Sequence, residues 1–234
     1  MIAFNFQPMD NDQDNISIQD FVQNKADLVA GLDPATADQI QVWDGAKFTT
    51  YFYRANSQRP LFTLGPCWVK NTTAEIGTPT TGTIPRGAGV WFARPTTASA
   101  GVITVSGAIN AASKTHNILA GFNMISSAFP CDFKFNDGPI DWESCGAIAG
   151  LDPATADQIQ VWDGQKFTTY FYRANSQRPL FTLGPCWVKN TTQEIGKPTT
   201  ETIPAGKGFW YARPTGKAAG TLIEKSPLAP KTAE

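Results

Sequence analysis

The sequence predicts an all-β protein made of two tandem antiparallel β-sandwich domains, of Greek-key or jelly-roll type, with short helical turns. The stretch Gly31–Gly77 returns as Gly150–Gly196 with two substitutions, so the chain contains two copies of one unit. Its 234 residues include 7 Trp, 15 Phe, 20 Gly and 17 Pro, a composition that favours short strands joined by tight turns. We place the first module at residues 1–112 and the second module at residues 113–234, each of ordinary size for one hydrophobic core.

Charge and hydropathy exclude two classes of partner. The chain carries 19 basic and 20 acidic residues, a net charge of −1, and only 17% of its residues are charged. A chain with no basic excess offers no electrostatic footprint for nucleic acid or for an anionic membrane surface. No apolar run approaches the roughly 18 residues that a membrane-spanning helix needs. We therefore expect no nucleic-acid partner and no membrane span.

The repeated stretch predicts one hairpin in each module. The runs at 39–43 and 47–53, which both contain apolar residues, flank Asp44-Gly45, a dipeptide that accepts the positive φ of a two-residue hairpin turn. The same hairpin is expected at 158–172. Breaks at Gly and Pro separate the next elements. These are expected strands at 61–64, 67–70, 90–94 and 101–105, followed by a polar connector at 106–117.

Acidic residues stand at alternate positions near the start of the chain. Asp10, Asp12 and Asp14 resemble the first half of a calcium loop, in which a hard cation takes several carboxylate oxygens from one tight turn. No glycine at the sharp turn and no closing glutamate follow, so a solvated polar loop is the alternative. Calcium is the one cofactor that this pattern suggests, and none is required. Just beyond, Ser17 and Asp20 resemble a capping box that starts a short helix.

The first module begins part-way through its expected opening strand. Met1-Ile2-Ala3 aligns with Met124-Ile125-Ser126, but Gly121-Phe122-Asn123 of the second module has no counterpart in the first. Either an upstream piece has been removed, or a neighbouring chain supplies the missing strand, because an open sheet edge carries unpaired N–H and C=O groups that invite one. The expected open edge consists of Met1, Ile2, Ala3 and Phe4.

Four motifs of the second module carry a resemblance. They are GFNMISSAFP at Gly121, DGPIDW at Asp137, VWDG at Val161 and IPAGKGFWYA at Ile203. Together they resemble the β-rich modules of bacterial secreted and cell-surface proteins. The motifs are turn and core signatures, so the resemblance implies a fold, an extracellular or cell-surface location, and a role in attachment, display or assembly. The first module lacks the GFN and IDW motifs.

The chain has few residues for catalysis. A nucleophilic triad or a zinc site needs a histidine in most of its forms, and the only histidine is His116 in the connector. A glycosidase needs two acids facing each other across a groove, whereas repeated acids such as Asp33 and Asp44 lie in expected turns. We therefore expect that the protein is not an enzyme.

Repeated tryptophans are candidates for ligand contacts. An indole face packs well against the apolar face of a sugar, so these residues suggest a platform for a surface polysaccharide. Each also lies in a strand-like run with apolar neighbours, and a core position is the alternative. The six candidates are Trp43, Trp68 and Trp91, repeated as Trp162, Trp187 and Trp210.

Four cysteines fit an exported protein. Cys131 and Cys145 occur only in the second module, and a disulfide between them would close a small loop and stabilise it by roughly 3 kcal/mol. We expect this bridge to form. Cys67 and Cys186 are repeat mates, and we expect buried, unpaired thiols there because equivalent positions of two domains rarely meet.

The expected function is structural. Near-identity of the two copies across core, turns and surface exceeds what one shared ligand pocket requires, whereas subunit packing reuses whole surfaces. We expect a non-enzymatic extracellular subunit of a filament, sheath or surface layer, joined to copies of itself head to tail by strand complementation. The alternative is a duplicated carbohydrate-binding or adhesive module, which gains avidity from two sites.

Overall fold

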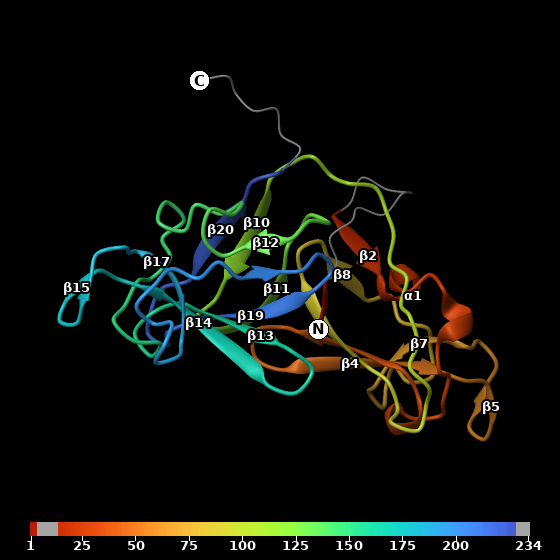
Figure 1. Ribbon diagram of the computed structural model, residues 1–234. Helices are drawn as coiled ribbons and strands as arrows, with labels where there is room; N and C mark the ends of the chain where they lie inside the picture. The colour runs from red at the N-terminus through yellow and green to blue at the C-terminus, as the bar shows by residue number, and fades with distance from the viewer. Residues whose placement is uncertain (4–13, 228–234) are drawn as a thin grey trace.

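The computed structural model describes residues 1–3 and 14–227 (Figure 1). Within these residues the only helical elements are α1 (Ile18–Phe21) and the 3-10 turns η1 (Lys25–Asp27) and η2 (Pro34–Thr36). The remaining regular elements are strands, and all the paired strands run antiparallel. The predicted all-β class is confirmed.

Each module contains one five-stranded sheet, and the two sheets have the same strand order. The first sheet has the order β1-β9-β3-β4-β7 and the second the order β11-β19-β13-β14-β17. The first sheet consists of β1 (Ile2–Ala3), β3 (Gln39–Trp43), β4 (Phe48–Arg54), β7 (Cys67–Lys70) and β9 (Gly89–Ala93). The second sheet consists of β11 (Gly121–Ser126), β13 (Gln158–Trp162), β14 (Phe167–Arg173), β17 (Cys186–Lys189) and β19 (Gly208–Arg213).

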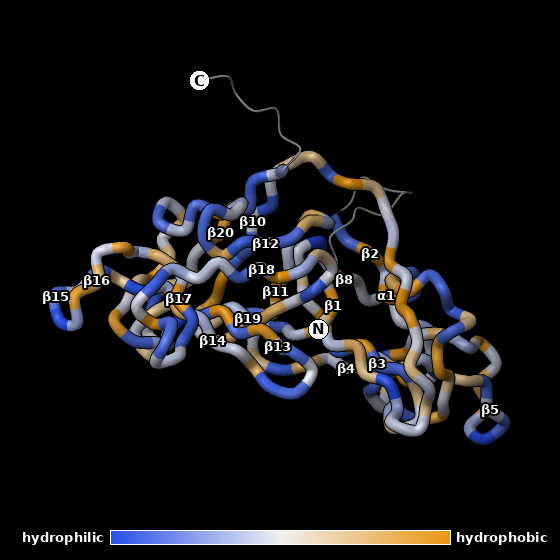
Figure 2. The backbone as a smooth tube through the Cα atoms, in the orientation of Figure 1, coloured by the Kyte–Doolittle hydropathy of each residue, from blue (hydrophilic) through white to orange (hydrophobic). Residues whose placement is uncertain are grey.

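Short two-stranded ladders complete the modules, in place of the second large sheet that a full sandwich would have. Ladders β2–β8, β12–β18 and β10–β20 place apolar residues in the same cores as the large sheets. Hairpins β5–β6 and β15–β16 lie at opposite ends of the molecule, with hydrophilic turns at their tips (Figures 1 and 2). The strands of the ladders and hairpins are β2 (Asn15–Ser17), β5 (Ser57–Gln58), β6 (Leu61–Phe62), β8 (Thr83–Pro85), β10 (Lys114–Ile118), β12 (Phe133–Lys134), β15 (Ser176–Gln177), β16 (Leu180–Phe181), β18 (Thr202–Ile203) and β20 (Gly220–Glu224).

The repeated hairpins form as expected, but with a longer turn. Trp43 pairs with Phe48, so four residues rather than two connect β3 to β4. Gly45 adopts a φ of 101°, and the Asp44 carboxylate accepts hydrogen bonds from two backbone N–H groups of the loop. These bonds lower the pKa of Asp44. The predicted two-residue turn is therefore wrong, because the aspartate side chain closes a wider loop of its own.

Ser17 caps the start of α1 as predicted, but the reciprocal half of the capping box is absent, because the Asp20 carboxylate accepts the Ser17 hydroxyl instead of the Ser17 backbone N–H. Ser17 is the N-cap residue, and its Oγ accepts the backbone N–H of Asp20 at 3.1 Å. Ile18 and Phe21 on the buried side of this single turn are fully inaccessible to solvent. The helix thus closes the first core, because its two apolar residues pack against the sheet while its first N–H groups are satisfied locally.

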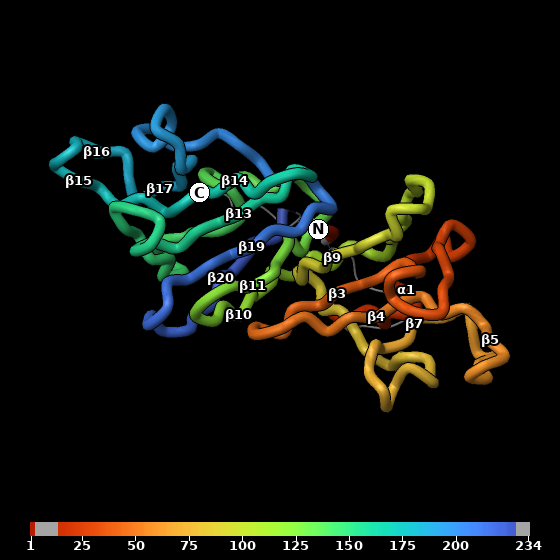
Figure 3. Tube along the Cα trace, turned by 90° about the horizontal axis from the view of Figure 1, so that it is seen from below, coloured from red at the N-terminus to blue at the C-terminus, as the bar shows by residue number. Residues whose placement is uncertain are grey.

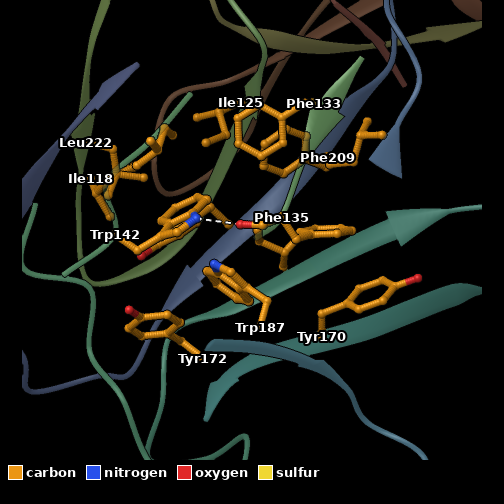
Figure 4. Close-up of a cluster of buried hydrophobic side chains, with 14 residues drawn as sticks. Ile118, Ile125, Phe133, Phe135, Trp142, Tyr170, Tyr172, Trp187, Phe209 and Leu222 are labelled. Atoms are coloured by element: carbon orange, nitrogen blue, oxygen red, sulfur yellow. Dashed lines mark hydrogen bonds between the residues drawn. The ribbon is translucent and has the colours of Figure 1, made fainter. Parts of the chain in front are cut away.

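Each core is centred on a tryptophan of the repeat. Trp68 and Trp187 both have no exposed surface. In the second module Trp187 packs edge to face against Trp142, whose Nε1 donates to the carbonyl oxygen of Phe135 at 2.7 Å (Figure 4). Such edge-to-face pairs stabilise a core by about 1 kcal/mol beyond the area that they bury.

Candidate assembly interface

The two modules contact each other through the same surface patch. Trp43 of the first module packs against Trp210 of the second, with ring centroids 5.4 Å apart, and Trp91 packs against Trp162 at 6.0 Å. Trp162 is the repeat mate of Trp43, and Trp210 is the repeat mate of Trp91. This reciprocal pairing is the signature of a two-fold, isologous interface, and the two modules lie on either side of the centre of the molecule in Figure 3.

We call this set of partly exposed rings the aromatic seam. It does not form a flat platform, because its ring pairs are tilted against each other by between 53° and 89°. Trp68 and Trp187 belong to the cores instead. The six candidate tryptophans thus divide into two core residues and four that join the modules. The seam consists of Trp43, Phe48, Trp91, Phe122, Trp162, Phe167 and Trp210.

Two glycines let the backbones approach at the centre of this contact. A Cβ on Gly89 would lie 2.8 Å from the carbonyl oxygen of Ile125, and a Cβ on Gly208 would lie 3.1 Å from that of Ile2. The two close contacts are equivalent in the repeat, because Ile2 in β1 and Ile125 in β11 occupy the same position in the edge strands of their sheets. A larger side chain at either glycine would push the modules apart.

The predicted assembly edge at the start of the chain faces the second module. Ile2 and Ala3 form β1, the edge strand of the first sheet, and pair with Val90 and Gly89. The close approach of Gly208 to Ile2 places the second module against this strand. Phe4 lies outside the described residues. The edge at Ile2 and Ala3 is therefore used inside the molecule.

A polar contact also connects the modules. Arg86, 2% exposed, donates to the Asp14 carboxylate at 2.7 Å, and Lys114 of the second module donates to it at 2.8 Å. Arg86 also donates to the carbonyl oxygen of Ala128 at 3.4 Å. Partial burial alone would raise the pKa of Asp14, but the hydrogen bonds from Arg86 and Lys114 outweigh it, so the pKa is lowered.

This contact bears on the predicted calcium loop. The Asp14 carboxylate is bound by two cationic side chains, which supply the positive charge that a bound cation would bring. Asp10 and Asp12 lie outside the described residues. Elsewhere in residues 1–3 and 14–227, no three His, Cys, Asp or Glu side chains are grouped to hold a metal ion. Calcium at this loop stays a prediction.

Glu224 is the polar centre of the second core and was not singled out from the sequence. Its carboxylate has no exposed surface and lies 2.9 Å from His116 Nε2. It also accepts the Ser127 hydroxyl at 2.6 Å and the Ala128 N–H at 2.9 Å. The repeat mate of Glu224 in the first module is Val105. The exchange of an apolar residue for an acidic one at this position is a signal that could have located this cluster.

These residues contain the components of a catalytic triad without its geometry. In a triad the histidine takes the proton of the serine and the acid orients the histidine. Here Ser127 donates directly to Glu224, and both Ser127 and His116 are buried. The serine hydroxyl thus contacts the carboxylate rather than the imidazole, so the order of contacts in a triad is not present.

The predicted disulfide is not formed. Cys131 and Cys145 are both free thiols. The Cys145 sulfur accepts the backbone N–H of Ile223 at 3.3 Å, while the pKa of Cys131 is raised by burial and by the nearby Glu224 carboxylate. Cys145 therefore contacts β20, whereas Cys131 has a side-chain hydrogen bond with Ser127. Spacing along the chain suggested a bridge, but the two side chains pack separately. Cys67 and Cys186 are buried free thiols, as expected.

The segment at residues 101–106 runs in extended form along the outer side of the first module, past the end of α1 (yellow-green in Figure 1). The Gln23 backbone N–H donates to Thr104 O at 3.0 Å, and Asn24 accepts the Thr104 N–H at 2.7 Å. The side chains of Asn24 and Gln23 also donate to the carbonyl oxygens of Val102 and Ser106. One edge of the segment is thus satisfied.

The opposite edge carries the backbone groups of Ile103 and Val105. Neither residue makes a backbone hydrogen bond to any residue that the structure describes. Their repeat mates, Leu222 and Glu224 on β20, pair with β10. We call the unpaired backbone groups of Ile103 and Val105 the open edge. The sequence pointed to an edge at the first residues of the chain instead, because alternating apolar residues do not show which strand pairs with which.

Among residues 1–3 and 14–227, no helix is long and apolar enough to cross a membrane. Comparison of the chain with family models, with curated proteins and with solved structures finds no match to any of them.

Proposed function

We propose that the protein is a non-enzymatic structural subunit of an extracellular filament, sheath or surface layer, and that copies of it join by adding a strand at the open edge of the first module. The observation that carries this proposal is the contrast between Ile103 and Val105, which pair with no described residue, and their mates on β20, which pair with β10.

An open edge of this kind favours strand addition. The N–H and C=O groups of Ile103 and Val105 need hydrogen-bond partners, and a strand from another chain supplies them while burying alternate side chains. Both side chains are half-buried and pack against the first core. An added strand would cover this part of the core as β10 covers the second.

The interface between the modules is not available for assembly, which leaves the open edge as a surface for further copies. A two-fold contact uses the same patch on both partners and closes on itself. The aromatic seam is such a contact, and it is occupied within one molecule. Further copies therefore need another surface, and the open edge is one that the first module has and the second lacks.

A location outside the cell rests on the resemblance to modules of bacterial secreted and cell-surface proteins. The non-enzymatic role is supported by the burial of His116, the only histidine, in a contact with Glu224. A surface polysaccharide as partner belongs to the alternative reading, in which the protein is adhesive. The tilted rings of the aromatic seam favour the structural reading over that one.

Light scattering coupled to size-exclusion chromatography tests the proposal on the full chain over a range of concentrations, with negative-stain microscopy of the same samples. We expect mass to increase with concentration. Val105→Lys, which places a charge at the open edge, should reduce association at least tenfold. Val102→Lys is the matched control, because Val102 is 74% exposed and its side chain points to solvent. A strictly monomeric wild-type protein at high concentration would overturn the proposal, and polysaccharide binding by that monomer would favour the adhesive alternative.

A further inference from the structure

We propose that the partner at the open edge is the same edge of a second copy, paired antiparallel about a two-fold axis through Thr104. This inference rests on the proposed self-association and specifies the geometry of one contact within it. Because a two-fold contact closes on itself, this pairing gives a dimer, and growth of a filament or layer from that dimer uses a different surface. Residues 102–106 have both a free edge and alternating apolar residues, the two features of the edge that has to be covered.

The backbone of the segment determines which groups are available. In an extended strand the N–H and C=O of successive residues point to opposite edges. Val102, Thr104 and Ser106 direct theirs to Gln23 and Asn24. The groups of Ile103 and Val105 therefore point the other way, toward the outside of the ladder.

This edge is complementary to itself. In an antiparallel ladder, residues that exchange both N–H···O bonds face one another at alternate positions. A two-fold axis at Thr104 sets Ile103 opposite the partner's Val105, and Val105 opposite the partner's Ile103. All four free N–H groups and all four free C=O groups of the two copies are then used. A shift of the register by one residue would bring the already bonded groups of Thr104 to the interface.

The side chains agree with this register. Residues directly opposite in an antiparallel pair project to the same face of the sheet. Ile103 and Val105 both pack against the first core, so pairing places apolar side chains against apolar side chains over that core. On the other face, exposed Thr104 meets the partner's Thr104, a favourable cross-strand pair.

Val105 disfavours the pairing of a strand like β10 with the open edge. In the second module β10 brings His116 to the Glu224 carboxylate at 2.9 Å. At the open edge the corresponding residue is Val105, which cannot accept a hydrogen bond. A β10-like strand would bury its histidine without an acceptor, which is costly. The substitution of valine for glutamate thus favours an apolar partner, and residues 102–106 of a second copy provide one.

Cross-linking by cysteine tests the register. A central pair such as Thr104 with the partner's Thr104 does not share hydrogen bonds, so its Cα atoms lie about 4.5 Å apart, within the range that a disulfide spans. Thr104→Cys is therefore expected to form a covalent dimer under mild oxidation, at least tenfold faster than Val102→Cys. In the proposed register the two Val102 positions are separated by about 13 Å along the ladder. A mixture of Val102→Cys with Ser106→Cys should cross-link, because these positions face each other.

The controls separate this inference from the proposed function. Wild-type protein, which carries the four native thiols, gives the background rate, and circular dichroism checks that each variant is folded. If light scattering shows self-association but Thr104→Cys cross-links no faster than Val102→Cys, the two-fold pairing is overturned and self-assembly stands. If the protein is monomeric and neither variant cross-links above the wild-type rate, both are overturned.

Discussion

The two modules share the strand order of their sheets but differ at the strand that follows β9 or β19. In the second module β20 pairs with β10 along five residues. In the first module the equivalent residues 101–105 form no ladder with any described residue. The difference extends to chemistry, because Glu224 of the paired strand is Val105 in the unpaired one. The two modules thus keep the same sheet, but the position that faces β10 in the second module is glutamate there and valine in the first.

The largest expected effect on the free energy of unfolding comes from placing in the second module the valine that the first module has at the position of Glu224. Glu224→Val leaves the Ala128 N–H, the Ser127 hydroxyl and His116 without their acceptor. The Ser127 hydroxyl can donate to the carbonyl oxygen of Phe129 at 3.0 Å instead. The other two buried groups cost about 1–3 kcal/mol each when they lose a hydrogen bond, so we expect the free energy of unfolding to fall by about 2–6 kcal/mol in urea titrations.

Glu201→Val is the control for this comparison. Glu201 is 46% exposed and pairs with Lys189 at the surface, where ion pairs contribute at most about 1 kcal/mol. If Glu224→Val changed the free energy of unfolding no more than Glu201→Val, the buried cluster would not be the feature that distinguishes the modules.

A smaller effect is expected at the aromatic seam, where the two-fold relation is incomplete. Trp210 packs against Phe122 with ring centroids 5.7 Å apart, in addition to its partners in the first module. Trp91, its repeat mate, has no ring in the place of Phe122 among the described residues. One aromatic pair stabilises by about 0.5–1.5 kcal/mol. Trp210→Ala should therefore lower the free energy of unfolding by about 1 kcal/mol more than Trp91→Ala.

Chemical denaturation of the two tryptophan variants measures this difference directly. Phe122→Ala in both backgrounds closes a double-mutant cycle, and it should add little to Trp210→Ala while adding its full cost to Trp91→Ala. Equal costs for the two tryptophans would mean that the ring of Phe122 contributes nothing to the seam.

The smallest expected effect is the pH dependence of the stability that the Asp14 carboxylate contributes. The pKa of Asp14 is below its usual value of 3.8. A depressed carboxyl pKa stabilises the folded state above the unfolded pKa, and this stabilisation is lost as pH falls through the folded pKa. The carboxylate is 37% exposed, so solvent screening limits the effect to about 0.5 kcal/mol.

Asp14→Asn isolates this contribution. The wild type should be more stable than Asp14→Asn at neutral pH, and the difference should shrink as pH is lowered from about 4 toward about 2. Other carboxylates titrate equally in both proteins and cancel in the comparison. A difference that stays constant over this range would show that the ion pairs of Asp14 with Arg86 and Lys114 do not stabilise the junction.

Local features of the fold were predictable because their causes lie within a few residues. The helix cap at Ser17 and the hairpin around Asp44-Gly45 both follow from side chains that bond to nearby backbone. The length of the hairpin turn was not, since the same Asp-Gly pair suits a two-residue and a four-residue loop. The choice depended on where the register of β3 and β4 aligned Trp43 with Phe48.

The candidate surfaces were predicted less well. The sequence indicated which tryptophans repeat, but a strand-like run does not show which face lies on a core and which on a second module. Cysteine spacing likewise left the orientation of Cys131 and Cys145 undetermined. The open edge at Ile103 and Val105 required knowing which strand pairs with which, information that alternation of apolar residues does not contain.

The sequence by itself determined the duplication, the all-β class, the turns and the helix start, because each depends on composition or on contacts between near neighbours. Only the tertiary structure decided the reciprocal pairing of the seam, the burial of Glu224 and the position of the open edge. His116 and Glu224 are 108 residues apart, and Asp14 and Lys114 are 100 apart. Contacts across such separations depend on how complete sheets pack, and packing is a property of the folded chain as a whole.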